Sequence, residues 1–205
     1  MKLKIVHYPH PALVHATKPV GRIDKQLNLQ IGAMLEAMYE ARGLGLAANQ
    51  VALPYQLLVT NLSGDATQRD QEAVYINPVI VERKGTQDGE EGCLSFPGLF
   101  QKVRRAKTVT VEAYNLNGDP VVLTANDLAA RCWQHELDHL NGVMFISKMG
   151  PIARLASRGS LKEFEREFRE AQKKGEIPPD AEIEKMLKAL EDGPEVVPDE
   201  AARIG

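Results

Sequence analysis

At 205 residues, the chain is long enough for one well-buried core with a small appendage. Hydrophobic residues make up 43% and charged residues 26%, an ordinary balance for a globular protein, and the net charge of −3 argues against a protein that coats nucleic acid generally. Two cysteines are too few for a disulfide framework, which favours a reducing compartment.

The N-terminal part of the chain predicts a helix and no targeting segment. The opening MKLKIVHYPHPAL has no apolar run long enough for a signal-peptide core, and no apolar stretch elsewhere is long enough to span a membrane, so we expect a cytoplasmic protein. Residues 24–43 then predict a helix, because Asp24 is suited to the N-cap and Gly43 to the end. Its apolar residues fall at helical spacing: Leu27, Ile31, Met34, Leu35 and Met38.

Strand-like segments fill much of the middle of the chain. Residues 55–62, 73–82 and 108–124 are rich in β-branched and aromatic residues, and the NLNGDP stretch at 115–120 is typical of a hairpin turn. A second helix is predicted from about Asn126 to Leu140, before Gly142. Strands and helices do not alternate regularly, so we expect an α+β domain over residues 1–155, with mostly antiparallel sheets packed around this second helix at the centre.

Residues 156–205 predict a charged, helical C-terminal extension. Its first helix has only a narrow apolar stripe, formed by Leu161, Phe164 and Phe168. A second short helix is predicted to start at Asp180, and the acidic, proline-containing end is expected to be flexible. We therefore interpret this part of the chain as an appendage.

The second predicted helix carries the sequence ARCWQHELDHLNG. His135 and His139 are four residues apart, so both imidazoles lie on one helical face, as they must to share an ion. Glu136 lies where a carboxylate can reach a metal-bound water without binding the metal itself. A helix with two partly buried histidines and a solvated glutamate is the alternative, but the full HExxH pattern favours a metal site.

A metal site of this kind needs a third protein ligand. Cys132 has suitable chemistry, but it is separated from His139 by about 10 Å of helical rise, so one straight helix cannot bring Cys132 and both histidines onto one ion. We interpret Cys132 as a core residue that lines the site. The remaining candidates are Cys93, in the segment GEEGCLSFPG between strands, and the downstream glutamates Glu163, Glu165 and Glu167. The chemistry favours Cys93 and leaves the glutamates open.

Three segments, in this order and spacing, resemble the signature motifs of the peptide deformylases. They are GLGLAANQ at 43–50, EGCLS at 91–95 and QHELDH at 134–139, within a similarity that covers residues 1–155. The resemblance implies metal-dependent hydrolysis of the N-formyl group from the formyl-methionine of nascent polypeptides, with release of formate. It also implies that Cys93, His135 and His139 bind one divalent metal ion. Fe(II) is expected from the family, with zinc, nickel or cobalt as substitutes.

The same resemblance assigns roles to other residues. Glu136 would be the catalytic carboxylate, and the side-chain amide of Gln50 and the backbone N–H of Leu94 would stabilise the oxyanion. Substrate-binding residues are expected at positions of three kinds: bare backbone for an extended peptide, the wall of the methionine pocket, and its rim. Gly43, Leu44, Gly45 and Gly92 would present backbone to the peptide. Leu128 and Cys132 would line the wall of the pocket, and Arg131 would lie near its rim. A helix C-cap and turn is the structural alternative for the glycine-rich segment.

Supporting residues and departures from the family pattern are less specific. We expect Glu91 either to pair with Arg104 or Arg105 and so fix the Cys93 loop, or to form an ordinary surface ion pair. Asp138 is expected to make a structural hydrogen bond or ion pair. Phe100 lies about where some members have an arginine near the substrate path. His10 replaces a residue that is acidic in many members.

Three functional hypotheses follow. The first is a deformylase that acts on formyl-methionyl nascent peptides, with no membrane or DNA partner. The second is an HExxH zinc peptidase that uses Glu163 or a neighbouring glutamate as the third ligand. The third is a catalytically inactive metal-binding or ribosome-associated protein, against which Gln50 and Glu136 argue. A basic stripe on the extension (Lys162, Arg166, Arg169 and Lys173) is interpreted as a solvated helix face, with contact to the ribosome near the exit tunnel as the alternative.

Overall fold

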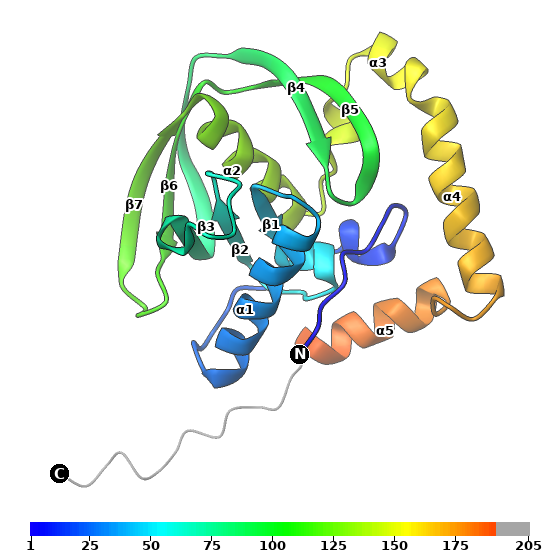
Figure 1. The fold of residues 1–205 in the computed structure, drawn as a ribbon, viewed down its shortest axis with the longest axis horizontal. Coiled ribbons are helices and arrows are strands. Elements are labelled where there is room, and N and C mark those ends of the chain that lie inside the picture. The colour runs from blue at the N-terminus through cyan, green and yellow to red at the C-terminus, as the bar shows by residue number, and fades with distance from the viewer. Residues whose placement is uncertain (192–205) are drawn as a thin grey trace, which may run out of the picture.

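The computed structural model describes residues 1–191 and shows two antiparallel sheets with helices around them (Figure 1). The main sheet has five strands in the order β1-β2-β3-β6-β7, and β4 and β5 form a separate two-stranded hairpin. The strands are β1 (Gly45–Ala47), β2 (Leu57–Asn61), β3 (Glu72–Lys84), β4 (Gln87–Cys93), β5 (Phe96–Arg105), β6 (Thr108–Tyr114) and β7 (Pro120–Asn126). The helices are α1 (Lys25–Glu40), α2 (Asp127–Leu140), α3 (Pro151–Ala156), α4 (Arg158–Lys173) and α5 (Asp180–Glu191). The predicted α+β class is confirmed.

Helix α1 forms where the sequence predicts it. The side chain of Asp24 accepts a hydrogen bond of 2.8 Å from the backbone N–H of Leu27, which satisfies one of the free donors of the first turn. Met34 and Met38 are fully buried against the first two strands. The helix ends at Glu40, three residues before the predicted end at Gly43.

Helix α2 lies at the centre of the domain, between the main sheet and the β4–β5 hairpin (Figure 1). Its sheet-facing side carries Trp133 and Leu137, which pack with Val109 and Val111 of β6. The opposite side faces the hairpin and carries His135 and His139. Because both sides are covered, polar side chains of this helix are held in a largely dry environment.

The β4–β5 hairpin differs from the sequence expectation. We predict Cys93 in an irregular segment, but it is the last residue of β4, and the pairing with β5 shifts register between Gly92 and Cys93. The stretch QDGEEG lacks the β-branched residues typical of a strand, so pairing with β5 decides its conformation. Within the described part of the chain, no helix has the length and apolar character needed to cross a membrane.

The C-terminal extension is helical, as predicted, and its helices α4 and α5 pack on the domain. Phe168 of α4 and Leu187 of α5 are buried in one cluster with Ala12 from the N-terminal segment. Figure 1 shows α4 along one side of the molecule and α5 beside the start of the chain. The predicted acidic, flexible end lies in residues 192–205, outside the described residues.

Two of the four residues of the predicted basic stripe on α4 form ion pairs. Arg166 forms ion pairs with Glu163 and Glu170, and Arg169 pairs with Asp180 at 2.8 Å. Since all these groups lie at the exposed surface, each pair adds little stability. The stripe nevertheless presents less free positive charge than the sequence suggests.

Candidate metal centre and active site

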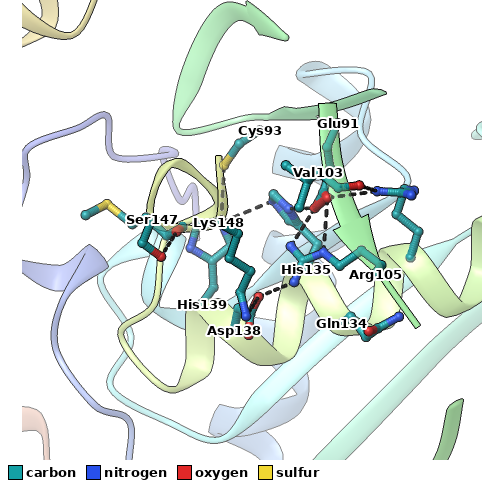
Figure 2. Close-up of polar contacts among 12 residues, drawn as sticks. Glu91, Cys93, Val103, Arg105, Gln134, His135, Asp138, His139, Ser147 and Lys148 are labelled. Atoms are coloured by element: carbon teal, nitrogen blue, oxygen red, sulfur yellow. Dashed lines mark hydrogen bonds and ion pairs between the residues drawn. The ribbon is translucent and has the colours of Figure 1, made fainter. Parts of the chain in front are cut away.

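Three donor side chains from two elements meet on the hairpin side of α2. Cys93, His135 and His139 each offer one ligand atom, and these atoms lie within 4.8 Å of one another. The Nε2 atom of His139 is 3.2 Å from Cys93 Sγ and 3.2 Å from His135 Nε2 (Figure 2). The third position, which the residues alone left open between Cys93 and the glutamates, is thus occupied by Cys93.

This donor set fits a divalent metal ion. A neutral imidazole has one donor and one acceptor nitrogen, and His135 Nδ1 already faces the carboxylate of Glu91, which orients Nε2 as the lone-pair nitrogen. That lone pair points at His139 Nε2 and lies near a cysteine sulfur, an arrangement of three donors around one point that a cation satisfies. A Cys/His₂ set is typical of borderline and soft divalent metals.

The other candidate ligands lie elsewhere. Cys132 is buried one turn before His135, outside the ligand group, and burial raises the pKa of its thiol well above its usual value. Glu163 is bound to Arg166, and Glu165 accepts a hydrogen bond from the hydroxyl of Tyr8. The peptidase hypothesis therefore lacks its third ligand.

Glu91 supports the metal centre from β4. Its Oε1 atom lies 2.7 Å from His135 Nδ1 and accepts a bond of 2.6 Å from Arg105, and its Oε2 accepts one of 3.2 Å from Arg131. Burial opposes ionisation of this carboxyl, but the hydrogen bonds from His135 and Arg105 outweigh it and lower the pKa to about 2. Glu91 therefore remains a carboxylate that fixes the His135 ring.

The alternatives for the charged neighbours are now resolved. Glu91 pairs with buried Arg105, whereas Arg104 pairs with exposed Asp88. Asp138 forms ion pairs with Arg105 and, at 3.2 Å, with Lys148, as expected for a structural role (Figure 2). Sequence reasoning missed the contact between Glu91 and His135, although a metal-binding histidine commonly donates its second nitrogen to a carboxylate.

Glu136 is positioned for proton transfer. It is 4% exposed, and its Oε2 atom has no hydrogen-bond partner among the described residues. Burial raises the pKa of this carboxyl to about 7, although the nearby His135 and Arg105 favour the charged form. A carboxyl group with this pKa can both accept and return a proton near neutral pH.

Gln50 and Leu94 lie beside Cys93. The side chain of Gln50 is held at both ends: Oε1 accepts from the backbone N–H of Ala47 at 2.9 Å, and Nε2 lies 3.3 Å from Ser95 Oγ and 3.6 Å from Cys93 Sγ. Its amide donor is thus fixed next to the ligand group. Leu94 is the next residue after Cys93 and lines the cavity that opens beside the ligand group.

A cavity of about 690 Å³ opens next to the ligand group. Most of the predicted catalytic and binding residues line it: Gly43, Leu44, Gly45, Gln50, Gly92, Cys93, Leu94, Leu128, Arg131, Cys132, His135 and Glu136. Gly45 requires the absence of a side chain, because an added Cβ would lie 2.8 Å from both Cys132 Sγ and Glu136 Oε1. Strand β1 is the first strand of the sheet, so one of its edges is available to an extended peptide.

Of two further lining residues, Arg131 differs from the expectation and Phe100 agrees with it. Arg131 is not at the rim: it is 7% exposed, and its guanidinium donates to Glu91 and to the backbone carbonyls of Val103 and Gln87. Phe100 is 59% exposed and also lines the cavity, with its ring directly over Gly92. Arg131 therefore supports the wall, whereas Phe100 faces the opening.

Comparison with known proteins agrees with the site. The family model for polypeptide deformylase matches residues 2–155. The peptide deformylase of Rhodopirellula baltica is 39% identical over 89% of this chain and 90% of its own length, and that of Chromobacterium violaceum is 46% identical over 80% and 97%. The crystal structure of a peptide deformylase from Legionella pneumophila matches with a TM-score of 0.74 at 40% identity, covering 81% of this chain and 96% of that one. The peptide deformylase of Plasmodium falciparum matches with a TM-score of 0.79 at 36% identity, covering 80% and 96%.

Proposed function

The chain belongs to the polypeptide deformylase family, and we propose that the residues around the Cys93 cavity carry out the reaction of that family. The reaction is hydrolysis of the N-formyl group from the N-terminal formyl-methionine of nascent polypeptides, which releases formate. The protein is thus a metal-dependent hydrolase of a linear amide. The observation that supports the assignment of residues is the convergence of Cys93, His135 and His139 next to the buried Glu136.

In this proposal Cys93, His135 and His139 hold one divalent ion, and family membership favours Fe(II), with zinc, nickel or cobalt as substitutes. The bound ion supplies Lewis acidity, which makes water a stronger acid and polarises an adjacent carbonyl oxygen. Glu91 holds the ring of His135 through Nδ1 and so keeps Nε2 directed at the ligand group.

Glu136 is the general base and then the general acid. The partner-free Oε2 takes a proton from the attacking water, and the same carboxyl returns it to the methionine nitrogen as the bond to the formyl carbon breaks. The pKa of about 7 suits both transfers at neutral pH. Because the group is buried, bulk water does not compete for this proton.

Gln50 and Leu94 stabilise the oxyanion. The amide of Gln50 is held in place by Ala47 and Ser95, so the free energy needed to reorient it is small when negative charge develops on the formyl oxygen. The backbone N–H of Leu94 is the second donor. Both groups lie directly beside Cys93, where the formyl carbon must be placed.

The peptide binds along the cavity. Gly43, Leu44 and Gly45 present backbone to the substrate, which pairs as an added strand on the free edge of β1. Leu128 and Cys132 line the pocket for the methionine side chain. Gly92 lines the cavity on the hairpin side, where the ring of Phe100 occupies the space that a side chain at position 92 would take. Arg131 stiffens the wall through Glu91.

The division of the chain and its place of work are also part of the proposal. Residues 1–155 form the catalytic domain, in agreement with the match over residues 2–155, and residues 156–205 form the extension. Because the substrates are nascent chains, we place the enzyme in the cytoplasm near the ribosomal exit tunnel. Lys162 and Lys173, two exposed basic residues of α4, would contact the ribosome.

Formate release from formyl-Met-Ala-Ser by anaerobically purified protein tests the proposal. We expect Glu136→Ala to lower kcat by about 10²–10⁴-fold, as for loss of a general base, with metal content unchanged. Cys93→Ser should lose metal, whereas the control Glu163→Ala should retain both metal and activity. Absence of formate with the wild-type protein would overturn the proposal, and metal retention by Cys93→Ser would overturn the ligand assignment.

A further inference from the structure

Helix α4 of the extension reaches the segment that carries Cys93. Phe164 packs edge-on against Phe96, with ring centroids 6.0 Å apart and an interplanar angle of 88°. Phe96 is completely buried and lies three residues after Cys93. Tyr8, from the N-terminal segment, stacks on Phe96 at 5.0 Å. The extension therefore covers one side of the hydrophobic support behind this ligand.

The same support extends to a second ligand. Phe145 packs edge-on against Phe96 at 5.4 Å, and its ring centroid lies 6.0 Å from that of His135. Phe145 is 1% exposed. We call Tyr8, Phe96, Phe145 and Phe164 the aromatic cluster. It forms a continuous packed path from α4 to both elements of the metal centre.

A polar connection runs beside the aromatic cluster. The hydroxyl of Tyr8 donates to Glu165 of α4 at 2.9 Å, and the backbone N–H of Tyr8 donates to the carbonyl of Ser95 at 3.0 Å. Ser95 is two residues after Cys93. The main chain beyond the ligand is thus tied to α4 through one side chain.

Cys93 depends on such support because regular pairing ends there. The register of the β4–β5 hairpin shifts between Gly92 and Cys93, and Leu94 and Ser95 form the turn. Cys93 pairs with Phe96 across this turn, and its Sγ accepts from the backbone N–H of Ser95 at 3.4 Å. The position of the sulfur relative to α2, which carries the two histidines, therefore follows that of Phe96 and Ser95. Packing behind the turn supports both of these residues, and a metal bond tolerates only small changes in donor position.

We propose that α4 is a positioning element for the metal ligand Cys93, and that Phe164 is its principal positioning residue. The inference rests on the proposed role of Cys93 as a ligand. It follows that the extension, although it lies outside the region matched by the family model, contributes to metal retention in this chain. Loss of the Phe164 ring should loosen the Cys93 turn and let the thiolate leave the metal more often.

The test compares two phenylalanines on the same helix in the cobalt-loaded protein. Phe168 is the matched control, because it packs with Ala12, Ile183 and Leu187 and lies outside the aromatic cluster. The readouts are the thiolate-to-cobalt charge-transfer absorption and the rate of cobalt release to an excess of chelator. We expect Phe164→Ala to weaken the absorption and to release cobalt about 10-fold faster, in the range for supporting residues of metal sites. Phe168→Ala should stay within about twofold of wild type, although both variants lower Tm.

Equal release rates for the two variants would overturn the inference, because the effect would then follow global stability. If Phe164→Ala does not fold, Phe164→Leu keeps the side chain apolar while removing the ring, and wild-type release from this variant would equally overturn it. The variant Cys93→Ser distinguishes failure of the proposed metal ligand from failure of the proposed positioning role of Phe164. Loss of the charge-transfer absorption in Cys93→Ser verifies the ligand, whereas its persistence would remove the proposed metal site itself.

Discussion

Glu91 Oε1 lies 2.7 Å from His135 Nδ1, so a carboxylate on β4 orients a metal-binding ring on α2. The same carboxylate accepts hydrogen bonds from two buried arginines, Arg105 and Arg131. One side chain therefore links the hairpin that carries Cys93 to the helix that carries both histidines.

The first prediction concerns this link. Glu91→Ala should lower metal affinity by about 10–100-fold, because His135 loses its acceptor. It should also lower the free energy of unfolding by about 3–5 kcal/mol, because Arg105 is left buried with less compensation. Metal titration and urea denaturation measure the two effects. The control Asp88→Ala breaks an exposed pair on the same hairpin and should cost at most about 1 kcal/mol with unchanged metal affinity. Similar losses in both variants would contradict the special role of Glu91.

The second prediction concerns the absence of a side chain at position 45. A Cβ there would lie 2.8 Å from Glu136 Oε1 and from Cys132 Sγ, so Gly45→Ala should displace the carboxyl that we propose as the general base. We expect kcat to fall at least about 10-fold and stability to fall by about 1–3 kcal/mol, as for overpacking. Gly32→Ala, at a helical position with nothing within 4 Å of the added Cβ, is the matched control. It should leave kcat unchanged and stabilise α1 by up to about 1 kcal/mol. Unchanged deformylation by Gly45→Ala would argue against the placement of Glu136.

The third prediction concerns the two thiols upon metal removal. Cys93 is partly exposed and would be protected by the metal, whereas Cys132 is buried and its pKa is raised by burial. Iodoacetamide should modify the metal-loaded protein slowly. It should modify the folded protein once, at Cys93, after a chelator has removed the metal, and the denatured protein at both cysteines. Mass spectrometry of the intact chain and of its peptides follows this pattern. Rapid modification of Cys132 in the folded, chelated protein would contradict the burial of α2.

The fourth prediction concerns acid stability. Burial lowers the pKa of His10 to about 4, against a smaller opposing effect of Asp180, and Nδ1 accepts a hydrogen bond from the N–H of Ala12. Between pH 6.5 and 4 the unfolded chain therefore binds a proton that the folded chain does not, and folding becomes less favourable as pH falls. We expect a loss of about 2 kcal/mol at this residue by pH 4, allowing for solvent screening.

The variant His10→Asn isolates this effect. Asparagine can accept the same hydrogen bond but does not titrate, so the stability of the variant should fall less between pH 7 and 4 than that of wild type. Urea denaturation at a series of pH values gives the difference. Parallel curves for the two proteins would show that His10 does not contribute.

Local periodicity and motif spacing were enough to predict several features of the fold and the site. Apolar spacing and the cap at Asp24 predicted α1, and His135 and His139 at i and i+4 predicted two ligands on one face of α2. These features are encoded within a few turns of one element. The EGCLS motif supplied Cys93 only through resemblance, since residue chemistry alone left the glutamates of α4 possible.

Contacts between separate segments, in contrast, could not be predicted from local patterns. The pairing of β4 with β5, the contact of Glu91 with His135, and the packing of Phe164 on Phe96 each join residues that are distant in the chain or lack a periodic signal. Such contacts depend on which surfaces pack together and on which buried charges form ion pairs, and the local sequence pattern specifies neither. For the same reason α4, whose narrow apolar stripe suggested an appendage, proved to be packed behind the metal centre.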